Sequence, residues 1–247
     1  MIIEGKNPVA EALSAGKTIE KLYVVKGNFE ATVNRIVQMA KAAKVPTVFT
    51  SKDTLDKLSP SGKHQGVVAY ATEFEYASMD DVYDLAKEKG EPLFVVILDG
   101  ITDPHNLGSI IRSAECVGAH GVIIPQRRAV GVSETVVKVS AGATEHVNVV
   151  KVTNVNDTIR ELKDRGVYVF STAMDGEPMY KANLTGDVAI VIGSEGDGIK
   201  RLTKELSDGV ISIPQYGKLN SLNAGVAAGI VMFEKARQEN SGHNAKT

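Results

Sequence analysis

The sequence has few of the residues that build disulfides and metal centres. A single cysteine, Cys116, occurs among 247 residues, so no disulfide can form within the chain. The histidines are scattered and lack the close spacing that metal-ligand pairs usually show. They are His64, His105, His120, His146 and His243. We therefore expect a protein that holds neither a disulfide nor a metal ion.

Long hydrophobic runs and a leader segment are also lacking. The longest apolar runs, residues 93–98 and 224–233, fall far short of the roughly 20 residues of a membrane-spanning helix. The opening stretch MIIEGKNPVAEAL has no basic region followed by an apolar core, so we expect no signal peptide. The mean hydropathy of −0.06 is ordinary for a globular protein. We expect a cytoplasmic protein without membrane contacts.

Charge is unevenly distributed along the chain, although the net charge is only −2. Residues 1–72 carry ten Lys and Arg against six Asp and Glu, whereas residues 73–247 carry eighteen against twenty-four. A basic small domain joined to an acidic larger one is consistent with an anion-binding module attached to a catalytic domain. Ordinary surface variation explains a difference of this size equally well.

The hydrophobic pattern predicts a small α/β unit over residues 1–72. Its helices are expected over residues 2–13, 29–44 and 52–58, and its strands over residues 22–25, 45–49 and 66–71. Residues 73–91 are polar, contain one weakly amphipathic helix, and are the predicted linker. Residues 92–247 form the second predicted domain.

In the second domain six strand-like apolar runs alternate with helical patterns, which predicts an α/β fold with an open, mainly parallel sheet. The expected strands cover residues 93–98, 121–124, 146–150, 167–171, 188–192 and 210–213. The expected helices cover residues 107–117, 133–140, 157–165 and 221–238. Loops at the carboxyl ends of such strands are where ligands bind in open α/β sheets.

The first motif, LDGITDPHNLGSIIRSA, leaves the strand at residues 93–98 and enters a helix. Asn106 in this motif could be the helix N-cap, since Asn is among the best caps. Arg112 lies beside the apolar stripe of the helix and needs an anion or a hydrogen-bonding partner. A structural ion pair is the alternative explanation for Arg112.

The second motif, GSEGDG over residues 193–198, follows the strand at residues 188–192. It matches neither the dinucleotide fingerprint nor the P-loop. Glycines let backbone groups approach a ligand closely, so we expect Glu195 to face a ligand. The alternative is a glycine-rich turn that carries an incidental acid.

The third motif, Ser221-Leu222-Asn223, opens the closing helix. Behind it, Gly225 and Gly229 lie four residues apart and leave one helix face almost bare. An exposed helix would not normally accept two interior glycines, each of which costs roughly 1 kcal/mol relative to Ala. We therefore expect this face to pack tightly on a loop or a partner subunit.

Together, N-L-G-x-x-x-R-S-A, I-G-S-E-G-x-G and I-S-I-P followed by S-L-N-A resemble the three motifs of the SpoU (TrmH-type) branch of the SPOUT RNA methyltransferases. The resemblance spans residues 93–237, and residues 1–72 resemble the L30e-like RNA-binding domain of rRNA-modifying members. It implies a Rossmann-like domain with a C-terminal trefoil knot. The sequence most resembles the members that methylate a guanosine 2′-hydroxyl in bacterial 23S rRNA.

The resemblance also implies a homodimer, with the closing helix near its interface, and site residues for cofactor, catalysis and RNA. S-adenosyl-L-methionine would be bound near Thr172, Ala173, Gly193, Ser194, Gly196, Ile213 and Leu222. The positions that match the catalytic centre are Asn106, Arg112, Glu195, Ser221 and Asn223. The candidates for RNA contacts are Lys6, Asn7, Lys63, His64, Gln65, Arg127 and Arg128.

The counterpart of Arg112 is proposed in the family as the general base, but a guanidinium is almost never neutral. We expect Arg112 instead to clamp a phosphate and to stabilise developing alkoxide charge. Asn106 and Asn223 would orient the ribose and Arg112, and Glu195 would hold the Arg or a loop. Asn220 and Gly225 stand where many members have Ser, which we expect to alter only loop detail.

Three alternatives remain at this point. A dinucleotide-dependent oxidoreductase would explain the α/β sheet but lacks the fingerprint. A non-catalytic rRNA-binding protein would not need Asn106, Arg112, Glu195 and Asn223 together. A tRNA ribose 2′-O-methyltransferase would share the chemistry and differ in the RNA.

Overall fold

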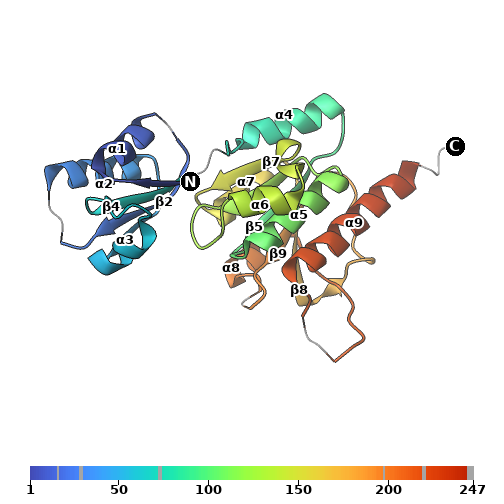
Figure 1. Ribbon diagram of the computed structural model, residues 1–247. Coiled ribbons are helices and arrows are strands. Elements are labelled where there is room, and N and C mark those ends of the chain that lie inside the picture. The colour runs from blue at the N-terminus through green and yellow to red at the C-terminus, as the bar shows by residue number, and fades with distance from the viewer. Residues whose placement is uncertain (16, 28–29, 72–73, 197, 219–220, 244–247) are drawn as a thin grey trace. The chain divides into compact units, whose positions relative to one another are not determined.

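The computed structural model describes residues 1–243 except 16, 28–29, 72–73, 197 and 219–220. Asp197 and Asn220, which were singled out in the motifs, therefore lie outside the described residues. The chain divides into two compact units, Met1–Glu75 and Tyr76–Thr247. Figure 1 shows the elements of both units.

The strands described in the first unit form a mixed sheet in the order β1-β4-β2-β3. β2 pairs parallel to β3 and antiparallel to β4, and β1 pairs antiparallel to β4. The bounds are Ile2–Glu4 for β1, Ile19–Val25 for β2, Thr47–Thr50 for β3 and Val67–Ala71 for β4.

The helix expected over residues 2–13 is wrong at its beginning. Residues 2–4 form β1, in which Ile2 lies opposite Tyr70 of β4, and helix α1 begins only at Lys6. Gly5, with φ of +94°, makes the change of direction between strand and helix. Because three residues are too few to show a period, the sequence could not separate this strand from the helix.

Helices α1 and α2 pack on the first sheet through a shared apolar core. The helices are α1 (Lys6–Ser14), α2 (Ala31–Ala42) and α3 (Lys52–Leu58). Val9 of α1 and Ile36 of α2 are fully buried in one cluster with Leu22 of β2. α3 buries Leu55 completely and is capped by Ser51, whose Oγ accepts from Thr54 N at 3.3 Å.

The second unit has a parallel sheet, as predicted, and the strands described in it have the order β10-β8-β9-β5-β6-β7. Every neighbouring pair in this sheet is parallel. The bounds are β5 (Phe94–Asp99), β6 (Gly121–Pro125), β7 (Asn148–Val152), β8 (Tyr168–Pro178), β9 (Val188–Gly193) and β10 (Gly209–Ser212). β8 thus continues well past its expected end at Ser171.

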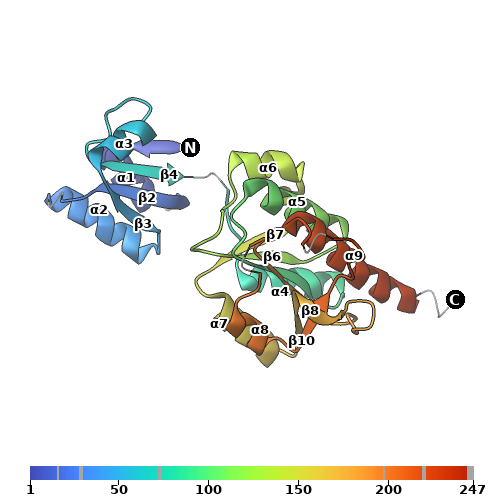
Figure 2. The same ribbon diagram turned by 90° about the horizontal axis from the view of Figure 1, so that it is seen from below.

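Helices cover both faces of this sheet (Figure 2), as in a doubly wound α/β domain. α5, α6 and α9 lie on one face, and α4, α7 and α8 on the other. Their bounds are α4 (Met79–Lys89), α5 (Pro104–Cys116), α6 (Glu134–Ser140), η1 (Ala143–Glu145), α7 (Val155–Asp164), α8 (Arg201–Leu206) and α9 (Ala224–His243).

Helix α8 was not expected, because it is short and shows no apolar stripe. Thr203 is its buried residue, whereas Leu202 is 45% exposed. A polar residue that faces the core and a leucine that faces outward give the reverse of the pattern from which helices are recognised. Packing against α7 and the hydrogen bond from Thr203 to Asp99 of β5, rather than its own sequence, therefore stabilise α8.

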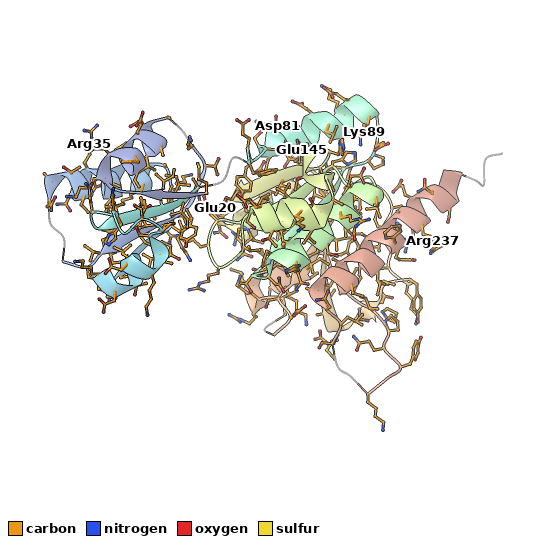
Figure 3. The ribbon with its side chains drawn as sticks, viewed as in Figure 1. Glu20, Arg35, Asp81, Lys89, Glu145 and Arg237 are labelled. Atoms are coloured by element: carbon orange, nitrogen blue, oxygen red, sulfur yellow. The ribbon has the colours of Figure 1, made fainter. Side chains whose placement is uncertain are left out.

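Residues 76–91, most of the predicted linker, belong to the second unit. Helix α4 begins with a capping box between Ser78 and Asp81, and Gly90 ends it in the left-handed conformation. Val82 is fully buried in the core of the second unit. Figure 3 shows Asp81 and Lys89 at opposite ends of this helix. An acid in the first turn and a base in the last turn both interact favourably with the helix dipole.

His120 fixes the start of β5 and provides a test of the fold. It is 1% exposed, its Nδ1 accepts from Phe94 N at 3.0 Å, and its Nε2 lies 3.2 Å from Glu91 Oε2. Burial lowers the pKa of His120 below its ordinary value. The native state therefore favours the neutral ring, whereas the unfolded chain takes up a proton below about pH 6.5.

Stability should consequently fall as the pH drops below about 6.5, by up to about 1.4 kcal/mol per pH unit from this group. We expect His120→Asn, whose side chain can still accept from Phe94 N but does not titrate, to lose less stability than the wild type between pH 7.5 and 5.5. Urea unfolding at both pH values measures this difference. Equal losses of unfolding free energy in the two proteins would show that protonation of His120 does not cause the pH dependence.

In the described part of the chain, we find no helix with the length and hydrophobicity to cross a bilayer. Within the same residues, no group of three or more His, Cys, Asp or Glu side chains is arranged to hold a metal ion.

Candidate active site

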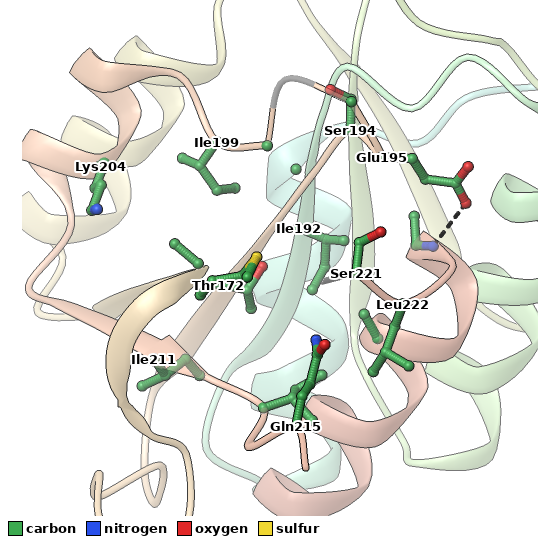
Figure 4. Close-up of a pocket in the computed structure, with 18 residues that line it drawn as sticks. Thr172, Ile192, Ser194, Glu195, Ile199, Lys204, Ile211, Gln215, Ser221 and Leu222 are labelled. Atoms are coloured by element: carbon green, nitrogen blue, oxygen red, sulfur yellow. Dashed lines mark hydrogen bonds between the residues drawn. The ribbon is translucent and has the colours of Figure 1, made fainter. Parts of the chain in front are cut away.

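A pocket of about 530 Å³ lies beside the middle of β8, where β9 and β10 end and α9 begins (Figure 4). Every residue predicted to bind the cofactor lines it: Thr172, Ala173, Gly193, Ser194, Gly196, Ile213 and Leu222. Two residues of the predicted catalytic set, Glu195 and Ser221, also line it. The second and third motifs, which follow β9 and β10, therefore meet in one cavity.

The sequence missed several residues of the pocket wall. They are Met174, Ile192, Gly198, Ile199, Lys204, Ile211, Gln215, Ala224 and Ala227. Ile192 and Ile211 are the inward-facing residues near the ends of β9 and β10, so the strand pattern could have found them. Lys204 comes from α8, which the sequence did not reveal. Its Nζ donates to Asp175 at 2.6 and 2.7 Å and lowers the pKa of that carboxyl.

Gly193 is required by the tight fold of the second motif. A Cβ at this position would lie 2.4 Å from the carbonyl carbon of Gly198 and 2.6 Å from Ile199 N. The loop closes through a bridge between Ser194 and Gly198, with Gly198 N donating to Ser194 O at 3.1 Å. The chain thus folds back on its own backbone, which only glycine permits.

Glu195 joins the three motifs through one carboxylate oxygen. Glu195 Oε1 accepts from Asn106 Nδ2 at 3.0 Å, from Asn223 Nδ2 at 2.7 Å and from Ala224 N at 3.0 Å. Asn223 Nδ2 also lies 2.8 Å from Asn106 Oδ1. The dashed line in Figure 4 marks the bond to the start of α9, where a negative charge also stabilises the helix dipole.

The reading of Asn106 as an N-cap is wrong. Asp103 caps α5, because its carboxylate accepts from His105 N at 2.8 Å, and Pro104 occupies the first turn. Asn106 lies within the helix and is only 7% exposed. Its amide is therefore free to bind Glu195 and Asn223.

The cap expected at Ser221 is also placed differently. α9 begins at Ala224, and Asn223 Oδ1 accepts from Val226 N at 3.2 Å, the bond that an N-cap side chain makes. Ser221 is exposed and lines the pocket instead. Asn223 thus begins α9 and binds both partners in the other two motifs.

Arg112 lies on α5 six residues after Asn106, and its side chain is exposed. Within the described residues we find no hydrogen bond or ion pair for its guanidinium, so the structural ion pair considered from the sequence is not observed. The described hydrogen bonds of Glu195 go to Asn106, Asn223 and Ala224, not to Arg112. Arg112 is therefore available to an external anion.

The bare face of α9 packs on α5 of the same chain, not on a loop or a partner subunit as expected. A Cβ on Gly225 would lie 3.3 Å from Ser109 Oγ, and one on Gly229 would lie 3.6 Å from Ser113 Oγ. Small residues on both helices therefore let α5 and α9 approach closely. Arg112 lies between Ser109 and Ser113 in the sequence of α5, so this contact places it on the helix that packs against α9.

Three of the candidate RNA-binding residues of the first unit, Lys6, His64 and Gln65, line a hollow of about 540 Å³. Lys6 is paired with Glu30. His64 is 4% exposed, with Nε2 2.9 Å from Asp56 Oδ1 and Nδ1 accepting from Gly66 N at 2.9 Å. Both ring nitrogens are thus occupied, so His64 shapes the loop rather than presenting a free donor.

The other candidates for RNA contacts are on the surface. Asn7, Lys63 and Gln65 are exposed in the first unit. Arg127 and Arg128 are exposed in the loop after β6 of the second unit. The exposed cations among them can reach an anionic ligand without loss of a buried contact.

Comparison with known proteins decides the family. The model of the SpoU rRNA methylase family matches residues 93–233, and the model for RNA 2′-O ribose methyltransferase substrate binding matches residues 2–77. The chain belongs to the SpoU rRNA methylase family. The resemblance expected from the three motifs is confirmed.

The relatives of this SpoU family chain are similar over almost its whole length. A TrmH family tRNA/rRNA methyltransferase of Bacillus subtilis, YacO, is 44% identical over 238 residues, which cover 96% of this chain and 95% of the relative. A protein of the same description from Staphylococcus aureus is 45% identical over 239 residues, 96% of each chain.

Solved structures agree. The SpoU methyltransferase AviRb of Streptomyces viridochromogenes, solved alone and with the cofactor AdoMet, is 25% identical and has a TM-score of 0.62 in both cases. It covers 98% of this SpoU family chain, which covers 90% and 91% of those structures. The α/β fold with a preceding substrate-binding unit is thereby confirmed.

Proposed function

We propose that this chain transfers a methyl group from S-adenosyl-L-methionine to the ribose 2′-hydroxyl of a guanosine in 23S rRNA. The observation that carries the proposal is the hydrogen-bonded junction of Asn106, Glu195 and Asn223 at the rim of the pocket. It brings one residue from each of the three motifs to the place where a bound cofactor would end and a ribose would enter.

The pocket fits the cofactor. Its volume of about 530 Å³ lies within the about 300–1,000 Å³ of small-molecule sites. Ile192, Ile211 and Ile213 give it apolar walls suited to a purine, and Gly193 and Gly196 offer backbone groups to polar atoms. These residues would hold S-adenosylmethionine, which supplies a methyl group already activated on a sulfonium.

The protein's part of the reaction is to position the ribose oxygen and to stabilise its charge. Asn106 and Asn223, held by Glu195, would orient the ribose at the pocket mouth. Arg112, exposed on α5 with no bond to the described residues, would grip the phosphate of the target nucleotide and stabilise the developing alkoxide. Ser221 on the pocket wall would contact the ribose or the loop that carries it.

RNA would be held by both units. Lys6 and Asn7 at the start of α1, and Lys63 and Gln65 in the loop shaped by His64, would bind the RNA backbone on the first unit. Arg127 and Arg128 would add phosphate contacts on the second. Binding through phosphates weakens steeply as salt is raised.

A tRNA is the second candidate substrate. It is favoured by the descriptions of the Bacillus and Staphylococcus relatives, which name both tRNA and rRNA. A non-catalytic RNA-binding protein is less well supported, because binding alone would not need the Asn106–Glu195–Asn223 junction beside a pocket of cofactor size.

The proposal includes a homodimer, a cytoplasmic location and a trefoil knot. β10 pairs with β8 at the sheet edge, whereas α9 packs on α5. The connection from β10 to α9 therefore passes the pocket, which Ile213 and Leu222 line. That path is consistent with the knot. Val226 and Phe233 of α9 are 52% and 54% exposed, which suits a partner helix.

The experiment that tests this function is transfer of a labelled methyl group from S-adenosylmethionine to 23S rRNA and to total tRNA, followed by mapping of the labelled nucleotide. Ribose label at one 23S guanosine is the expected result. Label on tRNA alone would retain the reaction and replace the substrate. Absence of cofactor binding would refute the proposal.

A further inference from the structure

A buried carboxylate at the end of β5 has no part in the chemistry described above. Asp99 is 2% exposed. Its Oδ1 is paired with Lys200 Nζ, and its Oδ2 accepts from Thr203 Oγ1 at 3.0 Å. Thr203 is itself 1% exposed. A charge removed from water requires such partners, so these three residues form one connected group.

The group attaches the exit of the glycine-rich loop to the sheet. Asp99 lies opposite Gly193 in the pairing of β5 with β9, so the sheet register fixes the entry of the loop. The chain then turns back through the Ser194–Gly198 bridge and reaches Lys200. One residue, Asp99, therefore lies beside the loop entry and binds the loop exit.

What lies between these two attachments is part of the candidate active site. Glu195 and Gly196 of the loop line the pocket, and so does Ile199, the residue directly before Lys200. Gly100, the residue after Asp99, lies against the same loop, because a Cβ there would be 3.7 Å from Ser194 Cβ. A displacement of Lys200 would therefore move the pocket wall.

We propose that Asp99 and Lys200 are positioning residues that hold Glu195, Gly196 and Ile199 of this loop where they can bind S-adenosylmethionine. The inference rests on the proposed function, since it concerns the same pocket. The two residues act through the loop and do not touch the ligand. Thr203 supports the group by fixing the second carboxylate oxygen, and it also lies 3.0 Å from Asn156 Oδ1 of α7.

The test is the affinity of the full-length protein for S-adenosylmethionine, measured by isothermal titration calorimetry without RNA. We expect Lys200→Met to raise the Kd about tenfold, since neighbouring residues that share a network couple by a factor of this size. Lys200→Arg, which keeps the charge, should restore most of the affinity. The Lys200 side chain is 55% exposed, so the Met variant opens no cavity, and Thr203 still donates to the Asp99 carboxylate.

The matched control is Arg201→Met on the adjoining residue. Arg201 also forms an ion pair, with Glu205 at 3.2 Å, but both side chains are solvent-exposed, at 90% and 53%. We expect its Kd to equal that of the wild type. An equal Kd for Lys200→Met and Arg201→Met would overturn the proposal.

A merely structural role is distinguished by thermal unfolding of the same variants. If Lys200→Met lowers the Tm while the Kd stays unchanged, Asp99 and Lys200 stabilise the fold and do not position the loop. Asp99→Asn, which keeps an acceptor for Thr203, should raise the Kd in the same direction as Lys200→Met. Failure of the wild type itself to bind S-adenosylmethionine would refute the proposed function, because that function requires the cofactor.

Discussion

Replacing Arg112 by Ala is expected to lower kcat for methyl transfer by about 100-fold or more, the usual loss when a group that stabilises transition-state charge is removed. The affinity for S-adenosylmethionine should not change, because Arg112 is not among the residues that line the pocket. The Tm should also be preserved, since the guanidinium is exposed on α5 and has no bond to the described residues. Single-turnover kinetics with calorimetric measurement of Kd separate the two effects.

Arg112→Lys tests how Arg112 acts. Lys keeps the positive charge but cannot bind a phosphate bidentately. We expect a loss close to that of Arg112→Ala, and near-wild-type turnover would contradict the clamp. Arg160→Ala is the control: this Arg is also on a helix surface, paired with Asp157 on α7, and should leave kcat unchanged.

Replacing Gly193 by Ala should abolish most cofactor binding. The added Cβ would come within 2.4 Å of the Gly198 backbone, so the loop must move away from the strand. Overpacking against an unyielding backbone costs about 1–3 kcal/mol. If the loop conformation carries that cost, the Kd for S-adenosylmethionine rises by about 5- to 150-fold. Calorimetric titration measures the change.

Gly217→Ala provides the comparison for this variant. Gly217 lies in the loop after β10, and no atom stands within 4 Å of the position that its Cβ would take. We expect unchanged affinity there. Wild-type affinity in Gly193→Ala would show that the loop adapts freely and that its tight fold is not needed by the ligand.

The sequence predicted the sheet of the second unit because its strands are buried on both faces. Val95, Ile97 and Val191 are fully buried, and their runs are almost continuously apolar. It could not predict α8, whose buried residue is Thr203, or the contribution of α4 to the core. Both elements owe their place to contacts with residues far away in the chain.

The candidate site was likewise predicted only in part. Glycines and a lone acid after a strand were enough to single out Glu195. The partner of Gly225 was not predictable, because a bare helix face shows that something approaches closely but not what. Asp99 also went unnoticed, since an Asp at a strand end has the same appearance in sequence whether it is buried or solvated.

The Glu195 junction has a consequence for folding. Its bonds join residues separated by 28, 89 and 117 positions, across most of the second unit. Contacts between such distant segments form only after long loops have closed. A partly folded chain, even with β5 and α5 in place, would have no such junction. Cofactor binding should therefore appear last during refolding and report on completion of the native structure.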